Sequence, residues 1–154
     1  MARAMTGRAA TDPALRTLLV QTALPVVLAE HLVLAGDFAA IGPTLEPMLQ
    51  PSGDAQVDAA LPMLQAIRDG FDAVRQFRQG DRDGCIATVD AVLERLRQRV
   101  SKRKGLLPST IGLPYAMALM AGSVPERLHK ALKFCLVEAG KRQPDPSTPW
   151  GLLA

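Results

Sequence analysis

The sequence has few of the side chains on which most enzyme and metal sites are built. Among its 154 residues there are two cysteines, two histidines, one tryptophan and one tyrosine. Cys85 and Cys135 are too few for a disulfide framework, and neither they nor His31 and His129 have the spacing of a zinc site. We therefore expect no metal and no cofactor. We interpret the cysteines as packing residues, His31 as a packed or half-exposed residue and His129 as a solvent-facing one.

Motifs for nucleotide binding and acid–base catalysis are also missing. The pair Gly140-Lys141 lacks the other residues of a phosphate-binding loop, and no dinucleotide fingerprint is present. The carboxylate pairs near glycines, Asp69 with Asp72 and Asp81 with Asp83, fit helix caps and solvated faces better than a catalytic pair in contrasting environments. We predict that the chain is not an enzyme; a small enzyme of unrecognised type is a third hypothesis.

No apolar run reaches the roughly 20 residues that a membrane span requires. The longest candidate, residues 15–34, is interrupted by Arg16, Pro25 and Glu30. No apolar stretch directly follows the arginines between Met1 and Ala14, as a secretory signal would require. We expect a cytoplasmic protein without a membrane partner.

Composition favours helices over strands. Apolar residues make up 48% of the chain but aromatic residues only 4%, and strands prefer aromatic and β-branched side chains. We predict an all-α fold with a leader at 1–11, a single helical domain at 12–142 and a proline-rich tail at 143–154. The expected helices cover 12–23, 26–35, a short or broken segment from 38 with a separate turn at 44–49, 55–79 with a possible start near 61, 82–104, 115–121 and 124–140.

The last of these helices has a predicted capping box, in which Ser123 and Glu126 satisfy the first amide groups. It also has a predicted amphipathic stripe that would face the core. The residues of this stripe are Val124, Leu128, Ala131, Leu132, Cys135 and Leu136.

Three glycines divide the chain at nearly equal intervals. Gly36, Gly80 and Gly122 each follow a predicted helix and precede a capping residue, and the first interval is almost the same as the second. Helical hairpins at a near-constant period are typical of α-solenoids, in which each pair buries its apolar stripe against the next. We predict antiparallel hairpins stacked as a short tetratricopeptide-like α-solenoid; the alternative is an irregular helical bundle.

Charge is distributed unevenly along the chain. Residues 1–94 carry 7 basic and 12 acidic side chains, a net charge of −5, whereas residues 95–154 carry 11 and 3, a net charge of +8. The densest basic segment is 95–104, where the candidate nucleic-acid-binding residues are Arg95, Arg99, Lys102, Arg103 and Lys104. Such a cluster can neutralise phosphates. The other interpretation is a solvated helix end whose cations favour the last carbonyl groups.

One segment resembles a known family. Residues 101–108 read Ser-Lys-Arg-Lys-Gly-Leu-Leu-Pro and are followed by an apolar segment at 115–120 and by Gly122. This block resembles the helical, tetratricopeptide-like accessory region of bacterial Swi/Snf-type helicase-like ATPases. The resemblance implies a non-catalytic region that contacts a protein partner or an adjacent domain of the same polypeptide. No catalytic residue of that family has a counterpart here.

Two functional predictions follow from these observations. The first is a helical scaffold for protein interactions, within a larger helicase-like ATPase, and it requires an exposed apolar groove or end face. The alternative is a helical domain that binds nucleic acid without sequence specificity through residues 95–104. No aromatic residue is interleaved with the cations there, so the sequence does not support specific base recognition.

Overall fold

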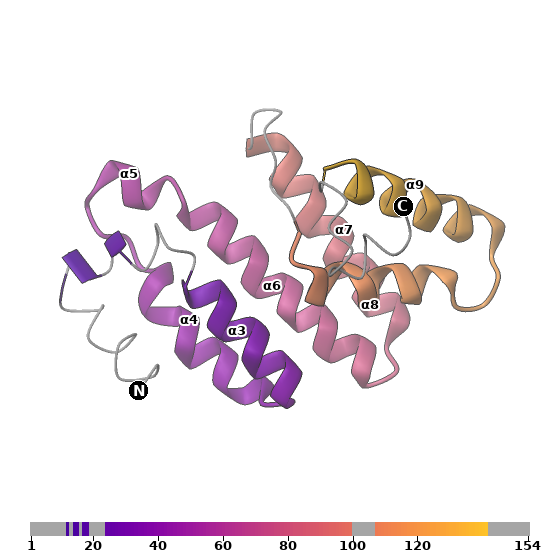
Figure 1. Ribbon diagram of the computed structural model, residues 1–154, viewed down its shortest axis with the longest axis horizontal. Coiled ribbons are helices and arrows are strands. Elements are labelled where there is room, and N and C mark those ends of the chain that lie inside the picture. The colour runs from indigo at the N-terminus through magenta and orange to yellow at the C-terminus, as the bar shows by residue number, and fades with distance from the viewer. Residues whose placement is uncertain (1–11, 13, 16, 19–23, 100–106, 142–154) are drawn as a thin grey trace. The chain divides into compact units, whose positions relative to one another are not determined.

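The computed structural model describes residues 12, 14–15, 17–18, 24–99 and 107–141, and these residues are all helical or lie in turns and short connections (Figure 1). The prediction of an all-α fold is confirmed for this part of the chain. Asp12 caps the first helical residues, since its Oδ1 accepts the N–H groups of Ala14 and Leu15 at 3.0 and 3.1 Å. The predicted leader and tail lie outside the described residues.

The chain forms two compact units, residues 1–71 and 72–154. Unit 1 contains α3 (Leu24–Ala35), the 3-10 turn η1 (Phe38–Ala40), α4 (Ile41–Leu49), α5 (Ala55–Asp58) and the first part of α6 (Leu61–Arg78). Helices α3 and α4 lie side by side (Figure 1). The buried side chains of this unit are mainly aliphatic and include Ala29, Val33, Leu45, Met48, Leu64 and Phe71.

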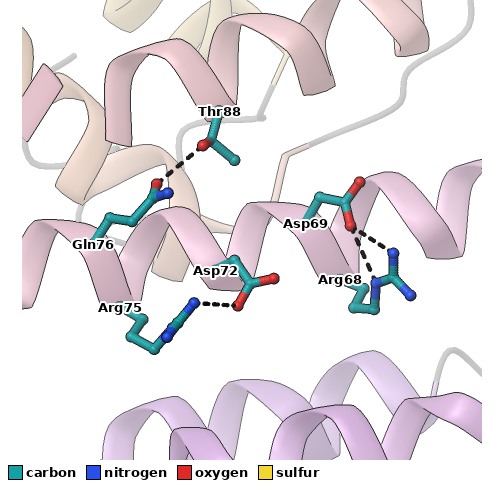
Figure 2. Close-up of polar contacts among 6 residues, drawn as sticks. All are labelled: Arg68, Asp69, Asp72, Arg75, Gln76 and Thr88. Atoms are coloured by element: carbon teal, nitrogen blue, oxygen red, sulfur yellow. Dashed lines mark hydrogen bonds and ion pairs between the residues drawn. The ribbon is translucent and has the colours of Figure 1, made fainter. Parts of the chain in front are cut away.

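Unit 2 contains the end of α6, α7 (Arg82–Arg99), α8 (Ser109–Met120) and α9 (Pro125–Lys141). Helix α8 packs against both α7 and α9. A hydrogen bond of 3.0 Å from the Thr88 hydroxyl to Gln76 Oε1 connects α7 to the end of α6 (Figure 2). The core is again mainly aliphatic and includes Val74, Cys85, Val89, Val92, Ile111, Tyr115 and Leu119.

Two charged pairs form along α6 between residues that are close in sequence (Figure 2). Arg68 pairs with Asp69 at 2.9 Å, and Arg75 pairs with Asp72 at 3.3 Å. Both aspartates therefore serve in local ion pairs. Asp72 is exposed, as the solvated-face interpretation predicts, whereas Asp69 is half-buried. Exposed pairs of this kind contribute about 0–1 kcal/mol each.

The three predicted glycine turns are present, but they are not identical. Gly36, Gly80 and Gly122 have φ angles of 76°, 86° and 95°, which favour glycine over residues with a Cβ. At Gly36 and Gly80 the following aspartate N–H bonds to the carbonyl five residues back, at 2.9 Å in both cases. This bond and the glycine's own bond to the carbonyl three residues back form a Schellman motif. At Gly122 the bonds differ, and the next residue, Ser123, also has a positive φ of 54°.

Two proline-containing segments continue as helices where the sequence predicted breaks. Helix α4 runs from Ile41 to Leu49 through Pro47, so the predicted separate turn at 44–49 is part of a longer helix. An internal proline costs about 3 kcal/mol. Burial of Leu45, Met48 and Leu49, at about 1.5–3 kcal/mol per side chain, outweighs that cost.

The prediction for α8 was wrong in the same way. The helix begins at Ser109 and continues through Pro114, whereas we placed its start at Tyr115. Its first bonds are the N–H groups of Ile111 and Gly112 to the Pro108 carbonyl, both 2.9 Å. Ile111, Gly112 and Tyr115 are all buried, so tertiary packing again overrides the local effect of proline. In unit 1, by contrast, the possible helix start near Leu61 is confirmed.

The capping box at Ser123 is not formed. Helix α9 begins at Pro125, which suits the first helical position because a proline has no N–H to satisfy there. Ser123 lies two residues before this start and has a left-handed backbone, whereas an N-cap residue has an extended one. The helix is thus initiated by Pro125 rather than by reciprocal bonds between Ser123 and Glu126.

We predict that Gly80→Ala lowers the free energy of unfolding by about 1 kcal/mol, because a Cβ is disfavoured at positive φ. A Cβ at Gly80 would meet no atom within 4 Å, so the effect isolates backbone strain from crowding. Gly80→Asn is the matched control and costs less, since asparagine adopts this conformation more readily. Urea unfolding followed by circular dichroism measures both, and equal costs for the two variants would contradict the assignment.

Candidate functional site

The candidate nucleic-acid-binding residues fall mostly outside the described structure. Arg95 is exposed on α7. Arg99 is the last residue of that helix, but its side chain is not described, and Lys102, Arg103 and Lys104 lie outside the described residues. The nearby Arg97 pairs with Glu94 at 3.6 Å on the surface. Only the Arg95 side chain among the five is described, so their nucleic-acid role stays a prediction.

The cysteines are in environments that suppress thiolate chemistry. Both are free thiols, with Cys85 fully buried and Cys135 half-buried. Burial, followed by the nearby Asp81 carboxylate, raises the pKa of Cys85 from 9.0 to about 11. Burial and then the negative charge of Glu138 raise the pKa of Cys135. Because the reactive form of cysteine is the thiolate, neither position resembles a nucleophile.

His31 and His129 are both exposed and lie in different units. The prediction for His129 is confirmed, whereas that of a packed or half-exposed His31 was wrong. The Nδ1 atom of His31 is 2.8 Å from the Val27 carbonyl on its own helix. Within the described ranges, no group of three or more His, Cys, Asp and Glu side chains is placed to hold a metal ion. No helix in this part of the chain combines the length and apolarity needed to cross a membrane.

A polar cluster in unit 2 connects three helices, α7, α8 and α9. Asp90 of α7 accepts a hydrogen bond of 2.6 Å from the Tyr115 hydroxyl of α8. Its other carboxylate oxygen is 2.5 Å from Lys130 Nζ of α9. Phe134 packs edge-on against the Tyr115 ring at a centroid distance of 5.0 Å. Burial and then the bond to Asp90 raise the pKa of Tyr115, so the phenol stays protonated and remains a donor.

A second ion pair reinforces the same contact between α9 and α7. Arg127 is 2.8 Å from Asp83, one turn before Lys130. These two pairs identify the side of α9 that faces α7. Leu132 is two residues from Lys130, which places it about half a turn away around the helix. The side of α9 that carries Leu132 is therefore directed away from α7.

The predicted core stripe of α9 is divided between the interior and the surface. Ala131 is buried and Cys135 is half-buried, as expected. Val124 is 39% exposed, and Leu128, Leu132 and Leu136 are 40, 60 and 64% exposed. These leucines are spaced by four residues and form one row along the helix. Our prediction that they belong to the core was wrong, because no described element covers that side of α9.

Helix α8 carries a second exposed apolar row. Leu113, Met117 and Met120 are each at least 40% exposed, and no residue of the helix is charged. Met117 is two residues from Tyr115, so it lies about half a turn from the side that contacts Asp90 of α7. Both rows thus point away from α7 on helices that are packed side by side. We call them together the hairpin surface: Leu113, Met117, Met120, Leu128, Leu132 and Leu136.

Sequence reasoning missed the Asp90–Tyr115–Lys130 cluster, because its members come from three different helices and share no motif. It also placed the leucine row in the core. For the exposed row of α8 the sequence did contain a signal. This helix is apolar on all its sides, and a helix of this kind is normally covered on all sides.

Comparison of the chain with protein-family models, with curated proteins and with solved structures finds no match.

We predict that Tyr115→Phe lowers the free energy of unfolding by about 1.5–3 kcal/mol, because it removes a hydrogen bond from a buried hydroxyl to a charged acceptor. Lys130→Met removes the other donor to the same carboxylate. Lys130 and Asp90 are 47 and 38% exposed, so this second change costs about 0–1 kcal/mol. Chemical denaturation of both variants tests the order, and a larger cost for Lys130→Met would overturn it.

We also predict a loss of stability at high pH that depends on Cys85. The folded chain holds this proton to a pKa of about 11, whereas the ordinary value is 9.0. The unfolded chain therefore loses the proton first, and the contribution to stability, complete below pH 9, disappears as the pH rises to 11. Between pH 8 and 10 wild type should lose about 1 kcal/mol more than Cys85→Ala. Equal losses in urea unfolding at the two pH values would contradict this.

Proposed function

We propose that this chain is a non-catalytic helical domain that binds a protein partner, or an adjacent domain of the same polypeptide, through the hairpin surface. The observation that carries the proposal is the exposure of six large apolar side chains on two neighbouring helices. Isolated exposed leucines are common, but apolar rows on neighbouring helices are typical of interaction sites.

The fixed orientation of the hairpin supports this role. Tyr115 and Lys130 connect α8 and α9 to Asp90 of α7. The two helices that carry the hairpin surface therefore already have a fixed orientation. A partner that binds such a surface loses little free energy in ordering it. Covering one exposed leucine contributes about 1–2 kcal/mol, so a few such residues suffice for micromolar binding.

The finer parts of the sequence prediction belong to the same proposal. A tetratricopeptide-like stack is supported by the nearly equal spacing of Gly36, Gly80 and Gly122, all of which have positive φ. A place in a bacterial Swi/Snf-type helicase-like ATPase is supported by the block at 101–108 alone. The two free thiols favour a cytoplasmic location.

Nucleic-acid binding by segment 95–104 remains the alternative hypothesis. Its support in the described residues is one exposed side chain, Arg95, and the hairpin surface has no part in it. The two functions differ in salt dependence, since phosphate binding weakens steeply as salt is added.

The partner is identified by photo-crosslinking. With a benzoylphenylalanine at position 132, we expect a crosslink in source cells to one protein, which is then purified and measured against the chain in vitro. Leu136→Gln should weaken this binding at least tenfold. Its matched control is Leu34→Gln, which changes an equally exposed leucine (69%) on α3 of unit 1, outside the hairpin surface; it should leave binding unchanged. Glutamine has nearly the helix propensity of leucine, so the first variant keeps its fold.

Two results would contradict the proposal. One is equal crosslinking from positions 132 and 34, or equal binding by the two glutamine variants. The other is a crosslink to nucleic acid with binding that depends on Arg95, Arg99, Lys102, Arg103 and Lys104; this would establish the alternative.

A further inference from the structure

The hairpin surface consists of apolar rows against which a helix can pack. Successive members of each row are about one helical turn apart, and α8 and α9 lie side by side. Neighbouring helices are about 8–10 Å apart, and a third helix packs its own ridges between such rows. Met117 and Met120, at one end, are flexible and adapt to varied partners.

The other common modes of peptide recognition lack their requirements in the described residues. Strand addition needs an exposed sheet edge, and residues 24–99 and 107–141 contain no strand. Recognition of proline-rich segments needs a groove lined with aromatic side chains. The five aromatic residues in the same ranges are all buried or half-buried, so none lies open on the surface: Phe38, Phe71, Phe77, Tyr115 and Phe134.

The charged side chains beside the hairpin surface indicate which charge a partner carries next to its apolar stripe. Arg127 and Lys130 are engaged by Asp83 and Asp90 of α7. Lys133 is exposed and lies one turn before Leu136, so the two side chains are neighbours on the helix surface. The exposed carboxylate of α9, Glu126, lies in the first turn, away from Leu136. The cationic border is thus at the C-terminal half of the leucine row, and α8 adds no charge.

We propose that the occupant of the hairpin surface is an amphipathic α-helix of a partner, with a leucine-type apolar stripe and an acidic border that pairs with Lys133. This inference rests on the proposed function and specifies its partner. The apolar stripe supplies most of the affinity, and the acidic border fixes the orientation of the helix and selects against basic helices.

The test uses the full chain and two designed 18-residue helical peptides. Both have leucines at the i, i+3, i+4, i+7 positions; one has glutamates along the border and the other has lysines. By fluorescence anisotropy at 50 mM salt, wild type should bind the glutamate peptide at least fivefold more tightly, and added salt should reduce the difference. Lys133→Glu should reverse the preference, and Leu136→Gln should weaken both peptides at least tenfold. Leu34→Gln, on α3, should bind as wild type does.

Each other outcome overturns a defined part of the proposal. If both peptides bind equally to wild type and to Lys133→Glu, and Leu136→Gln abolishes binding, the acidic border is wrong while the protein-binding function stands. If neither peptide binds but the crosslinked protein does, the helical partner is wrong. If neither peptide nor crosslinked protein binds, the function itself fails. Binding to vesicles of anionic phospholipid that requires Leu136 would replace the helix with a membrane surface.

Discussion

The Asp90 carboxylate is the interaction on which unit 2 depends. It accepts hydrogen bonds from the Tyr115 hydroxyl and the Lys130 ammonium at the same time, and in doing so it determines the rotation of α8 and of α9 about their own axes. Rotation of either helix by half a turn would bury the exposed row and expose the core row. These two bonds thus agree with the burial of Ile111, Leu119 and Ala131 in selecting which row of each helix is exposed.

The rest of unit 2 agrees with this arrangement. The Phe134 ring packs edge-on against Tyr115, and Arg127 repeats the contact with α7 one turn away. Small buried residues on α8, Gly112, Ala116 and Ala118, let its neighbours approach closely on the core side. The large side chains Leu113 and Met117 remain on the other side. Steric and electrostatic preferences thus lead to the same orientation.

Local signals in the sequence predicted the ends of helices better than their starts. Gly36 and Gly80 were predicted as turn residues because a positive φ is costly for other residues, a constraint that acts within a few residues. The starts near Pro47 and Pro114 were misplaced because the cost of a proline was weighed without the burial that offsets it. That burial depends on residues distant in sequence, which a local rule does not include.

The candidate surface was only partly predictable for a related reason. An apolar row of period four predicts that one side of α9 is covered, but the pattern is the same whether the cover is the chain's own core or another molecule. Leu128 and Leu132 were assigned to the core on this basis, and their exposure distinguishes the two cases. The cluster around Asp90 had no local pattern at all, since its three members come from three helices.

The absence of charge in α8 has a consequence for the life of the protein in solution. A helix with twelve uncharged residues has no side chain that repels a second copy, and its apolar row is open. While this row is exposed, two copies of the chain can associate through it, and the extent of that association increases with the concentration of the chain. A bound partner removes this exposed area and at the same time stabilises the folded state by mass action. The abundance of this domain in the cell would then follow the abundance of whatever covers it.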